Sequence, residues 1–325
     1  MVQTKLDNDT TGDDLVIQLS NEIKHKVILV TGVSPGGLGA WFVEAIAKVS
    51  PKLVILASRD VKKALAIVTR IKEAKDGVET RILHLDTASL KSVRRAADEI
   101  REFPEAIDVL VNNIGIMATP YSKTEDGFES QWQTNYLGPF LFTNLIIDKV
   151  LASGPDGRVV NVSSEGYRGG GVRYHDYNFH DGDSYNPWVA YAASKTALIL
   201  YTKELARRLG KMGLTTVSIC PGAVMTGLQS HGAMEVFGAV VSLYRMLGDP
   251  KGWSAPNVLA PDKGIRNHVY AAFAPEIKDC NGCYFFDLEK LAVAEQDMAP
   301  WAAGCLEAKK TWELSEKLLN QKFDI

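Results

Sequence analysis

The chain has 325 residues, of which 46% are hydrophobic and 23% charged, and its formal net charge is -3. This composition is typical of a soluble globular protein with a large core, and the charge gives no basic surface for nucleic acid or an anionic membrane. The sequence has no apolar run of membrane-spanning length, and residues 1–20 do not resemble a signal peptide.

A glycine-rich turn follows the first clear strand pattern. Residues 26–30 are a β-branched apolar run, typical of a buried strand, and residues 40–49 have helical apolar spacing. Glycines let a backbone approach a pyrophosphate closely, and a helix N-terminus offers it free N–H groups. We therefore predict that the turn binds a dinucleotide, through Gly32, Ser34, Gly37, Leu38 and Gly39.

The second predicted strand, residues 53–57, ends in Ser58, Arg59 and Asp60. In a dinucleotide-binding fold this position meets the adenosine ribose, where a carboxylate selects NAD and an arginine accommodates the 2′-phosphate of NADP. Because the Arg59 guanidinium suits a phosphate, we favour NADP(H) over NAD, with Ser58 and the hydroxyl of Ser34 as further contacts. Asp60 is expected to cap a helix over residues 61–74.

Strands and helices continue to alternate. The third strand, residues 80–85, leads to Asp86, which either accepts a hydrogen bond from the adenine amino group or caps the next helix. Further strands are predicted at 107–111, 158–162 and 216–220, and helices at 90–103, 128–147 and 189–209. This order predicts an α/β fold with a Rossmann-type, doubly wound parallel sheet and right-handed crossovers.

The remaining segments are assigned by composition. Residues 165–186 are polar and glycine-rich, which is typical of a surface insertion. Residues 227–262 mix apolar helical spacing with breakers, and because the segment after the last cofactor-binding strand usually closes over the substrate in this architecture, we expect a helical substrate lid there. A helix over 263–274, a strand at 282–286 and a C-terminal helical tail over 288–325 follow. No linker or repeat divides the chain, so we predict one NAD(P)-binding domain over residues 1–325, with an N-terminal extension over 1–24.

Tyr191 and Lys195 are the one pair in which a tyrosine stands four residues before a lysine. In a helix they lie one turn apart on the same face. A tyrosine with a pKa of about 10 is a poor base at neutral pH, and a nearby ammonium group favours the phenolate. The pair is therefore either an acid/base centre or an ordinary surface pair.

The four cysteines of the chain do not suggest a disulfide framework and favour a reducing compartment, so we expect a cytoplasmic protein. Cys280 and Cys283 have the spacing of a zinc half-site or a redox pair. A structural zinc site needs two further ligands, and Cys220 and Cys305 do not form a second pair. We expect reduced cysteines near a turn and no metal.

Taken in order, these motifs resemble the short-chain dehydrogenase/reductase family over residues 26–287. The matching residues are Thr31-Gly32 and the later glycines, Asn112-Asn113-Ile114-Gly115, Asn135, Ser164, Tyr191-Ala192-Ala193-Ser194-Lys195 and Pro221-Gly222 with Thr226. The sequences of residues 158–164 and 202–206 are similar to those of the retinol-dehydrogenase-like branch. The glycine turn is similar to that of fungal family members that act in secondary metabolism.

The resemblance implies a role for each matching residue. Tyr191 would exchange a proton with the substrate oxygen, Lys195 would lower its pKa and hold the nicotinamide ribose, and Ser164 would bind the substrate oxygen. Asn135 would hold a water in a proton relay. The cofactor contacts implied are Asn112, Gly115, Pro221, Gly222, Val224 and Thr226.

Two features depart from the family. Four residues separate Gly32 from Gly37 where the family has three, so Pro35 and Gly36 are expected to bulge outward. The chain also lacks the apolar N-terminal helix of the membrane-anchored retinoid enzymes, which disfavours a membrane-bound retinoid enzyme.

The resemblance implies an NADP(H)-dependent oxidoreductase that interconverts a ketone and a secondary alcohol. The apolar residues of the lid segment indicate a medium-to-large apolar substrate, such as a secondary metabolite. The alternative is that these side chains only pack on the body of the protein or on a partner subunit. They are Leu228, Met234, Phe237, Tyr244 and Met246. The alternatives are a dehydratase or epimerase on the same scaffold, or a cofactor-bound scaffold protein without turnover. By analogy, pairing of helices 128–147 and 189–209 between subunits implies a homodimer or homotetramer.

Overall fold

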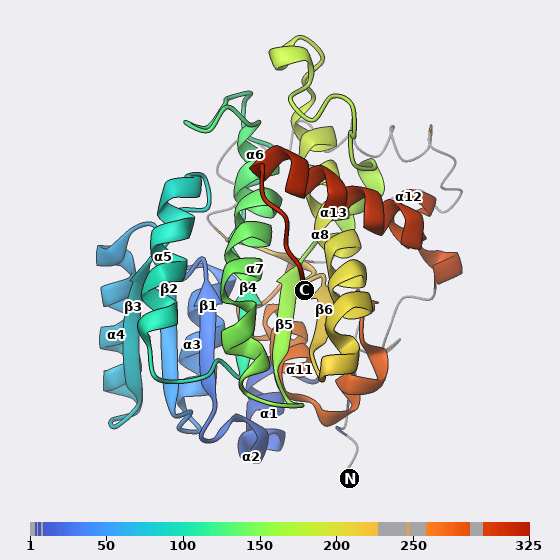
Figure 1. Cartoon of the computed structure of the whole chain (residues 1–325). Helices are drawn as coiled ribbons and strands as arrows, with labels where there is room; N and C mark the ends of the chain where they lie inside the picture. The colour runs from blue at the N-terminus through green and yellow to red at the C-terminus, as the bar shows by residue number, and fades with distance from the viewer. Residues whose placement is uncertain (1–3, 5, 8, 227–245, 247–257, 287–294) are drawn as a thin grey trace.

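A seven-stranded parallel sheet forms the centre of the protein, with strand order β3-β2-β1-β4-β5-β6-β9 (Figure 1). The computed structural model describes residues 4, 6–7, 9–226, 246, 258–286 and 295–325. The strands are β1 (Val27–Thr31), β2 (Leu53–Ser58), β3 (Glu79–His84), β4 (Val109–Asn112), β5 (Arg158–Val162), β6 (Thr215–Ile219) and β9 (Tyr284–Phe285). The predicted Rossmann-type doubly wound sheet is confirmed.

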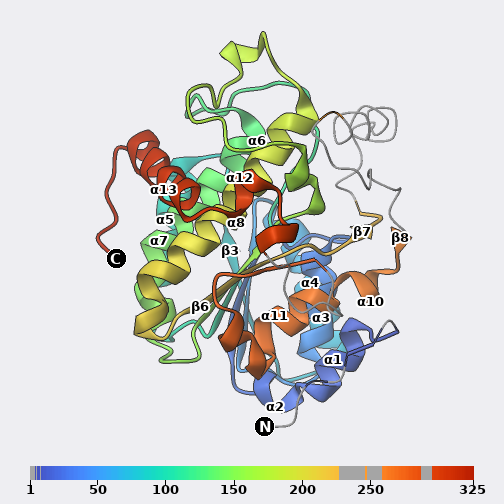
Figure 2. The same ribbon diagram turned by 90° about the vertical axis from the view of Figure 1, so that its right-hand side faces the viewer.

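Helices cover both faces of this sheet (Figure 2). One face carries α3 (Leu38–Ala47), α4 (Val61–Ala74) and α11 (Arg266–Phe273), and the other carries α5 (Leu90–Glu102), α7 (Gly138–Leu151) and α8 (Pro187–Leu209). Successive strand residues alternate between the two cores: Ile28 packs in the first, and Leu29 in the second. Because both faces are buried, the strands read as continuous apolar runs in the sequence.

The predicted helix start at Asp60 is confirmed. Its carboxylate accepts hydrogen bonds from the backbone N–H groups of Lys62 and Lys63, at 3.0 and 3.2 Å. These bonds satisfy donors that have no partner inside the first turn of α4, which favours a helix beginning at Val61.

The N-terminal segment contains two short helices that the sequence pattern did not predict, α1 (Gly12–Gln18) and α2 (Ser20–Ile23). Thr11 and Asp14 cap α1 reciprocally, each side chain accepting from the other's backbone N–H. Leu15 is fully buried, and α1 contacts α3 and α11. Residues 12–23 therefore pack on the body of the protein.

Two predicted segments differ in detail from the structure. The helix expected over 128–147 is divided into α6 (Ser130–Trp132), a π-helical turn (Gln133–Leu137) and α7. The interval 165–186 is not only a surface insertion, because Tyr167 and Phe179 are buried in it. Tyr167 packs edge-on against Tyr284 of β9, with 5.2 Å between ring centroids.

Most of the predicted lid lies outside the described residues, including Leu228, Met234, Phe237 and Tyr244, whereas Met246 is described and exposed. The flanking residues form a small parallel pair, β7 (Ala223–Val224) and β8 (Val258–Leu259), followed by α10 (Pro261–Gly264). The helix expected over 263–274 is therefore divided between α10 and α11.

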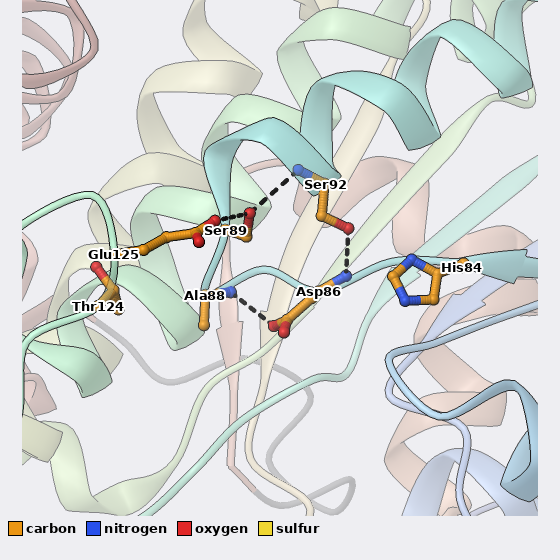
Figure 3. A pocket seen from close by; sticks show the side chains of 7 residues that line it. All are labelled: His84, Asp86, Ala88, Ser89, Ser92, Thr124 and Glu125. Atoms are coloured by element: carbon orange, nitrogen blue, oxygen red, sulfur yellow. Dashed lines mark hydrogen bonds between the residues drawn. The ribbon is translucent and has the colours of Figure 1, made fainter.

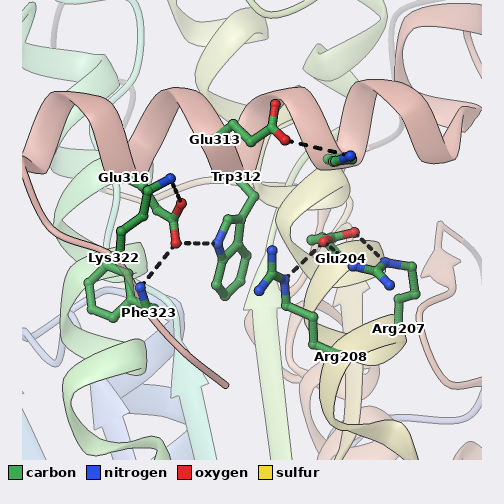
Figure 4. A network of polar contacts seen from close by, with 9 residues as sticks. Glu204, Arg207, Arg208, Trp312, Glu313, Glu316, Lys322 and Phe323 are labelled. Atoms are coloured by element: carbon green, nitrogen blue, oxygen red, sulfur yellow. Dashed lines mark hydrogen bonds and ion pairs between the residues drawn. The ribbon is translucent and has the colours of Figure 1, made fainter.

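The predicted helical tail consists mainly of α12 (Pro300–Ala303) and α13 (Cys305–Leu319), and α13 lies across the outer face of α7 and α8 (Figures 1 and 4). Trp312 is fully buried, with its ring centroid 5.0 Å from that of Phe140 and 5.9 Å from that of Tyr201. Phe323 covers Phe140 from the chain end, at 5.5 Å. Subunit pairing through α7 and α8, as expected by analogy, would have to use other residues of these helices.

In the part of the chain that the structure describes, no helix has both the length and the apolar character needed to cross a membrane.

Candidate active site

The predicted site residues gather at the carboxyl ends of the parallel strands. The sheet reverses its strand order between β1 and β4, and ligands of doubly wound sheets bind outside the carboxyl ends at such a point. The glycine turn follows β1, Asn112 to Gly115 end β4 and follow it, and Ser164 comes shortly after β5. The topology therefore brings together motifs that are far apart in the sequence.

Tyr191, Ser164 and Lys195 form one cluster at this edge. The Ser164 side chain hydrogen-bonds the Tyr191 phenol, and the Lys195 ammonium lies 5.7 Å from the centre of the Tyr191 ring. Lys195 Nζ also donates to the carbonyl of Val162, at 2.9 Å. The tyrosine and the lysine are both almost fully buried, which excludes the alternative of a surface pair.

Burial controls the protonation of this cluster. It raises the pKa of Tyr191, and the hydrogen bond from Ser164 only opposes that rise. Burial also lowers the pKa of Lys195 to about 8. The resemblance implied that Lys195 lowers the Tyr191 pKa, but the net shift is upward because the loss of solvation outweighs the favourable contacts.

The two adjacent serines have different partners. Ser163 is buried, and its hydroxyl donates to the backbone carbonyl of Lys195 at 2.9 Å. The Ser164 hydroxyl accepts from the backbone N–H of Gly166, at 3.0 Å, and contacts Tyr191. The geometry therefore supports Ser164 as the serine that can reach a substrate oxygen.

Asn135 lies beside Lys195, in the π-helical turn. Its side chain accepts from the N–H of Ile116 at 2.8 Å, and donates to the Ile116 carbonyl at 2.9 Å and to Ser194 Oγ at 3.0 Å. A Cβ atom on Gly115 would lie 3.4 Å from both Asn135 Oδ1 and Lys195 Nζ. Asn135, Gly115 and Lys195 are thus neighbours, with the Asn135 amide fully engaged.

The glycine turn has the features that a pyrophosphate needs. Gly37 N–H donates to the Ser34 carbonyl at 3.0 Å, so Pro35 and Gly36 form the exposed tip of a tight turn, as expected from the longer spacing. Gly36 has a φ of 73°, which favours glycine. Helix α3 then starts at Leu38 with no side-chain cap and no acidic residue in its first turn, which leaves N–H groups for an anion. These residues fit a dinucleotide.

The adenosine side of the site is open to solvent. Arg59 is exposed directly after β2, whereas the Ser58 hydroxyl lies inward and donates to the backbone carbonyl of Asp60 at 3.2 Å. Asp86 lines a hollow of about 450 Å³ together with His84, Ala88, Ser89, Ser92, Thr124 and Glu125 (Figure 3). Its Oδ1 accepts from the Ala88 N–H at 3.0 Å, and Ser89, not Asp86, caps α5. The alternative prediction, that Asp86 caps the helix that follows it, is therefore wrong.

The residues expected at the nicotinamide end follow β6. Pro221 and Gly222 lie in a loop, and Gly222 has a φ of 80°. A Cβ on Gly264 would lie 2.5 Å from the Val224 side chain and 3.1 Å from that of Leu38, so α10 brings these two predicted contacts together. Thr226 is partly exposed.

Asn112 is placed differently from the expectation. Its amide donates to Thr143 Oγ1 and to Asn161 Oδ1, both at 2.9 Å, inside the protein. The side chain thus joins β4 to β5 and α7, so only the backbone of Asn112 is available to a cofactor.

Four residues near the site make contacts that the sequence did not predict. Asn113 and Thr31 join the ends of β4 and β1, and the doublet Asn112-Asn113 was the signal for this. A Cβ on Gly166 would lie 2.8 Å from the Tyr191 ring, so a side chain there would displace the ring. Cys220 Sγ accepts from the N–H groups of Glu165 and Gly222, at 3.3 and 3.4 Å, which ties the Ser164 loop to the Pro221 loop.

The Cys280–Cys283 motif lies away from this edge. Their thiols hydrogen-bond each other, and the N–H of Cys283 donates to the carbonyl of Cys280 at 3.1 Å, which closes a turn before β9. None of the four cysteines, all of which are described, forms a disulfide. Within the described ranges no group of three or more His, Cys, Asp or Glu side chains is arranged to hold a metal.

Comparisons with known proteins identify relatives of the chain. The model of the short chain dehydrogenase family matches residues 26–178 and 180–234. The chain is 36% identical to retinol dehydrogenase 13 of Homo sapiens, over 91% of this chain and 85% of that protein. It is 35% identical to the short-chain dehydrogenase/reductase prx1 of Penicillium roqueforti, over 92% and 86%.

Solved structures give the same fold. An uncharacterized protein from Mycobacterium paratuberculosis superposes with a TM-score of 0.68 at 30% identity, covering 93% of this chain and 96% of that one. The L-sorbose reductase of Gluconobacter frateurii, solved with NADPH and L-sorbose, superposes with a TM-score of 0.59 at 20% identity, covering 82% and 95%.

Proposed function

Because the chain belongs to the short-chain dehydrogenase family of oxidoreductases, we propose that it interconverts a ketone and a secondary alcohol with NADP(H), using Tyr191 as the general acid/base. The observation that carries this proposal is the contact between Ser164 and Tyr191 beside the buried Lys195. A binding protein without turnover has no need of a buried tyrosine, serine and lysine in contact. When bound, the nicotinamide supplies or accepts the hydride.

Each residue of the cluster has a separate task. Ser164 donates a hydrogen bond to the substrate oxygen and stabilises the charge that develops there. Tyr191, whose pKa burial raises, keeps its proton at neutral pH and can donate it to that oxygen when a ketone is reduced. Lys195 holds the nicotinamide ribose, and Asn135 supports the proton relay from its place beside Lys195.

The proposed cofactor contacts extend along the strand ends. The pyrophosphate lies at the start of α3, against Gly32, Ser34, Gly37, Leu38 and Gly39. Arg59 meets the 2′-phosphate, which is the reason for NADP(H) rather than NAD. Asp86 accepts from the adenine amino group, and Pro221, Gly222, Val224 and Thr226 frame the carboxamide.

We propose a medium-to-large apolar ketone or alcohol as the substrate, with a secondary metabolite as the leading case. Two relatives support this proposal. One is named a retinol dehydrogenase, and retinol is a bulky apolar alcohol. The other is a short-chain dehydrogenase/reductase of the fungus Penicillium roqueforti, which supports a secondary metabolite. Exposed apolar side chains also lie at the strand ends beside the site, namely Met225, Val258 and Phe286.

The family analogy also favours a homodimer or homotetramer, and the interface must then spare the aromatic residues that α13 covers. We propose a cytoplasmic location, which the four cysteines without disulfides support.

The test measures the oxidation of NADPH from the loss of its absorbance, with a panel of ketones that ranges from small sugars to bulky apolar compounds. We expect turnover with bulky apolar ketones, and loss of most activity in Tyr191→Phe with unchanged NADPH affinity. Tight NADPH binding without oxidation by any ketone would instead favour a dehydratase, an epimerase or a scaffold protein. A preference for small sugars would refute the apolar substrate, and an active Tyr191→Phe would refute the acid/base role.

A further inference from the structure

One asparagine holds the backbone where the glycine turn leaves β1. Asn113 Nδ2 donates to the carbonyl of Thr31 at 3.1 Å and to that of Gly32 at 3.3 Å. The backbone N–H groups of Asn113 and Ile114 donate to Thr31 Oγ1, at 3.0 and 3.2 Å. Four hydrogen bonds thus join the loop after β4 to the start of the glycine turn.

The asparagine amide lies against two glycines of the turn. A Cβ atom on Gly39 would lie 2.7 Å from Asn113 Nδ2, and one on Gly32 would lie 3.2 Å from it. No side chain fits between the turn and Asn113, and rotation of the amide would break its hydrogen bonds to the Thr31 and Gly32 carbonyls. The conformation of the turn and the orientation of Asn113 are therefore coupled.

His268 contacts the oxygen of the Asn113 amide. Two carbonyl groups face the amide, and only its NH₂ group can bond both, so Oδ1 faces His268 Nε2 at 3.3 Å. Nε2 must then carry the ring proton. Burial lowers the pKa of His268 to about 4, against an opposing contact with the Gly264 carbonyl, so the ring is neutral and has a single N–H at physiological pH.

His268 reaches this position from α11, which is remote in sequence from the glycine turn and packs beside α3 (Figure 2). The ring is fully buried, and its centroid lies 5.9 Å from that of Phe42 on α3. A purely structural contact at this place could be made by an apolar ring. The bond to Asn113 requires an N–H donor.

We propose that His268 is a positioning residue for the dinucleotide, which holds the glycine turn in its binding conformation by fixing Asn113. This inference rests on the proposed NADP(H) function. Without the N–H, the half-buried Asn113 side chain loses the donor to its oxygen, and the amide can leave the Thr31 and Gly32 carbonyls. The turn then occupies several conformations, and the apparent affinity for the cofactor falls in proportion to the fraction of molecules whose turn is in the binding conformation.

The test compares His268→Phe with His268→Gln, whose side-chain amide can place an N–H donor near the position of Nε2. Titration calorimetry with NADPH should show a Kd about tenfold higher for His268→Phe, which corresponds to about 1.4 kcal/mol. The KM for NADPH should rise in parallel, with kcat and the KM for the ketone within about twofold of wild type. His268→Gln should restore most of the affinity.

Phe273→Leu is the matched control. Phe273 stacks on the same Phe42 ring, at 6.2 Å, and makes no hydrogen bond to Asn113 through its apolar ring. It should lower stability with little change in NADPH affinity. An equal rise of the Kd in His268→Phe and Phe273→Leu would mean that His268 acts only by packing, and an unchanged Kd in His268→Phe would also overturn the proposal.

Nitrogen-15 NMR of the histidine rings in the unmodified protein gives a second test that does not depend on the folding of any variant. The proposal requires a neutral His268 ring with its proton on Nε2, and the Nδ1–H tautomer would contradict it. Failure of the wild-type protein to bind NADPH would refute the proposed function itself, a result distinct from an unaltered affinity in His268→Phe.

Discussion

The Ser163 hydroxyl donates to the backbone carbonyl of Lys195 at 2.9 Å, which fixes the end of β5 to the middle of α8. This bond uses Ser163 inside the protein, while Ser164 turns toward Tyr191. Two adjacent residues of the same type therefore have different tasks: one holds the scaffold and the other reaches the site.

Ser164→Ala and Ser163→Ala should separate these tasks. Loss of the Ser164 hydroxyl removes a donor to the developing oxyanion and should lower kcat about 100- to 1,000-fold. It also removes the acceptor of the Gly166 N–H, so the free energy of unfolding should fall by about 1 kcal/mol. Ser163→Ala should lower the free energy of unfolding by about 1 kcal/mol and reduce kcat far less. Steady-state kinetics and urea unfolding measure both, and a larger kcat loss in Ser163→Ala would reverse the assignment.

The sequence predicted the parallel sheet and most of the site because strand-end polar residues recur in a fixed order beside apolar runs. It could not predict the placement of Asn112, because an asparagine after a strand can turn to the ligand or to the next strand. His268 gave no signal, since its partner Asn113 is distant in sequence. Likewise, the periodicity of α13 shows that it is amphipathic and does not show that it covers α7 and α8.

Arg59→Asp should distinguish the two cofactors. Replacing the guanidinium with a carboxylate removes a partner of the 2′-phosphate and adds repulsion, so the KM for NADPH should rise about 100-fold. NADH has no 2′-phosphate, so its KM should change less than about threefold. Arg101→Asp carries the same charge change at the far end of α5, and it should affect neither cofactor. Equal losses with NADPH and NADH would refute the 2′-phosphate contact.

Because of the protonation of Lys195, the affinity for NADPH and the free energy of unfolding should depend on pH in opposite directions. Burial lowers its pKa from 10.5 to about 8, so above pH 8 the folded protein loses an ammonium that the unfolded chain keeps to about pH 10.5. The Kd for NADPH should be constant below about pH 8 and rise above it, since the ammonium is the form that holds the nicotinamide ribose.

The stability effect of the same lysine has the reverse sign. Below pH 8 the buried charge costs stability, and this cost disappears as the pH rises from about 8 to 10.5, because the unfolded state then binds more protons than the folded one. Urea unfolding should therefore show Lys195→Met more stable than wild type at pH 7, with a smaller difference at pH 9.5. A difference independent of pH would show that Lys195 is not a charged, desolvated group at neutral pH.

Trp312→Ala should test whether α13 is an integral part of the fold. The indole is fully buried between Phe140 and Tyr201, the Arg208 guanidinium lies 4.1 Å from its ring centre, and Nε1 donates to Glu316 at 3.0 Å (Figure 4). Removing a buried tryptophan leaves a large cavity, so the free energy of unfolding should fall by about 3–5 kcal/mol in urea titrations. Leu306→Ala, an exposed position on the same helix, should change it by less than about 0.5 kcal/mol. If both variants unfolded at the wild-type urea concentration, the packing of α13 on α7 and α8 would be wrong, and that face would again be available to a partner subunit.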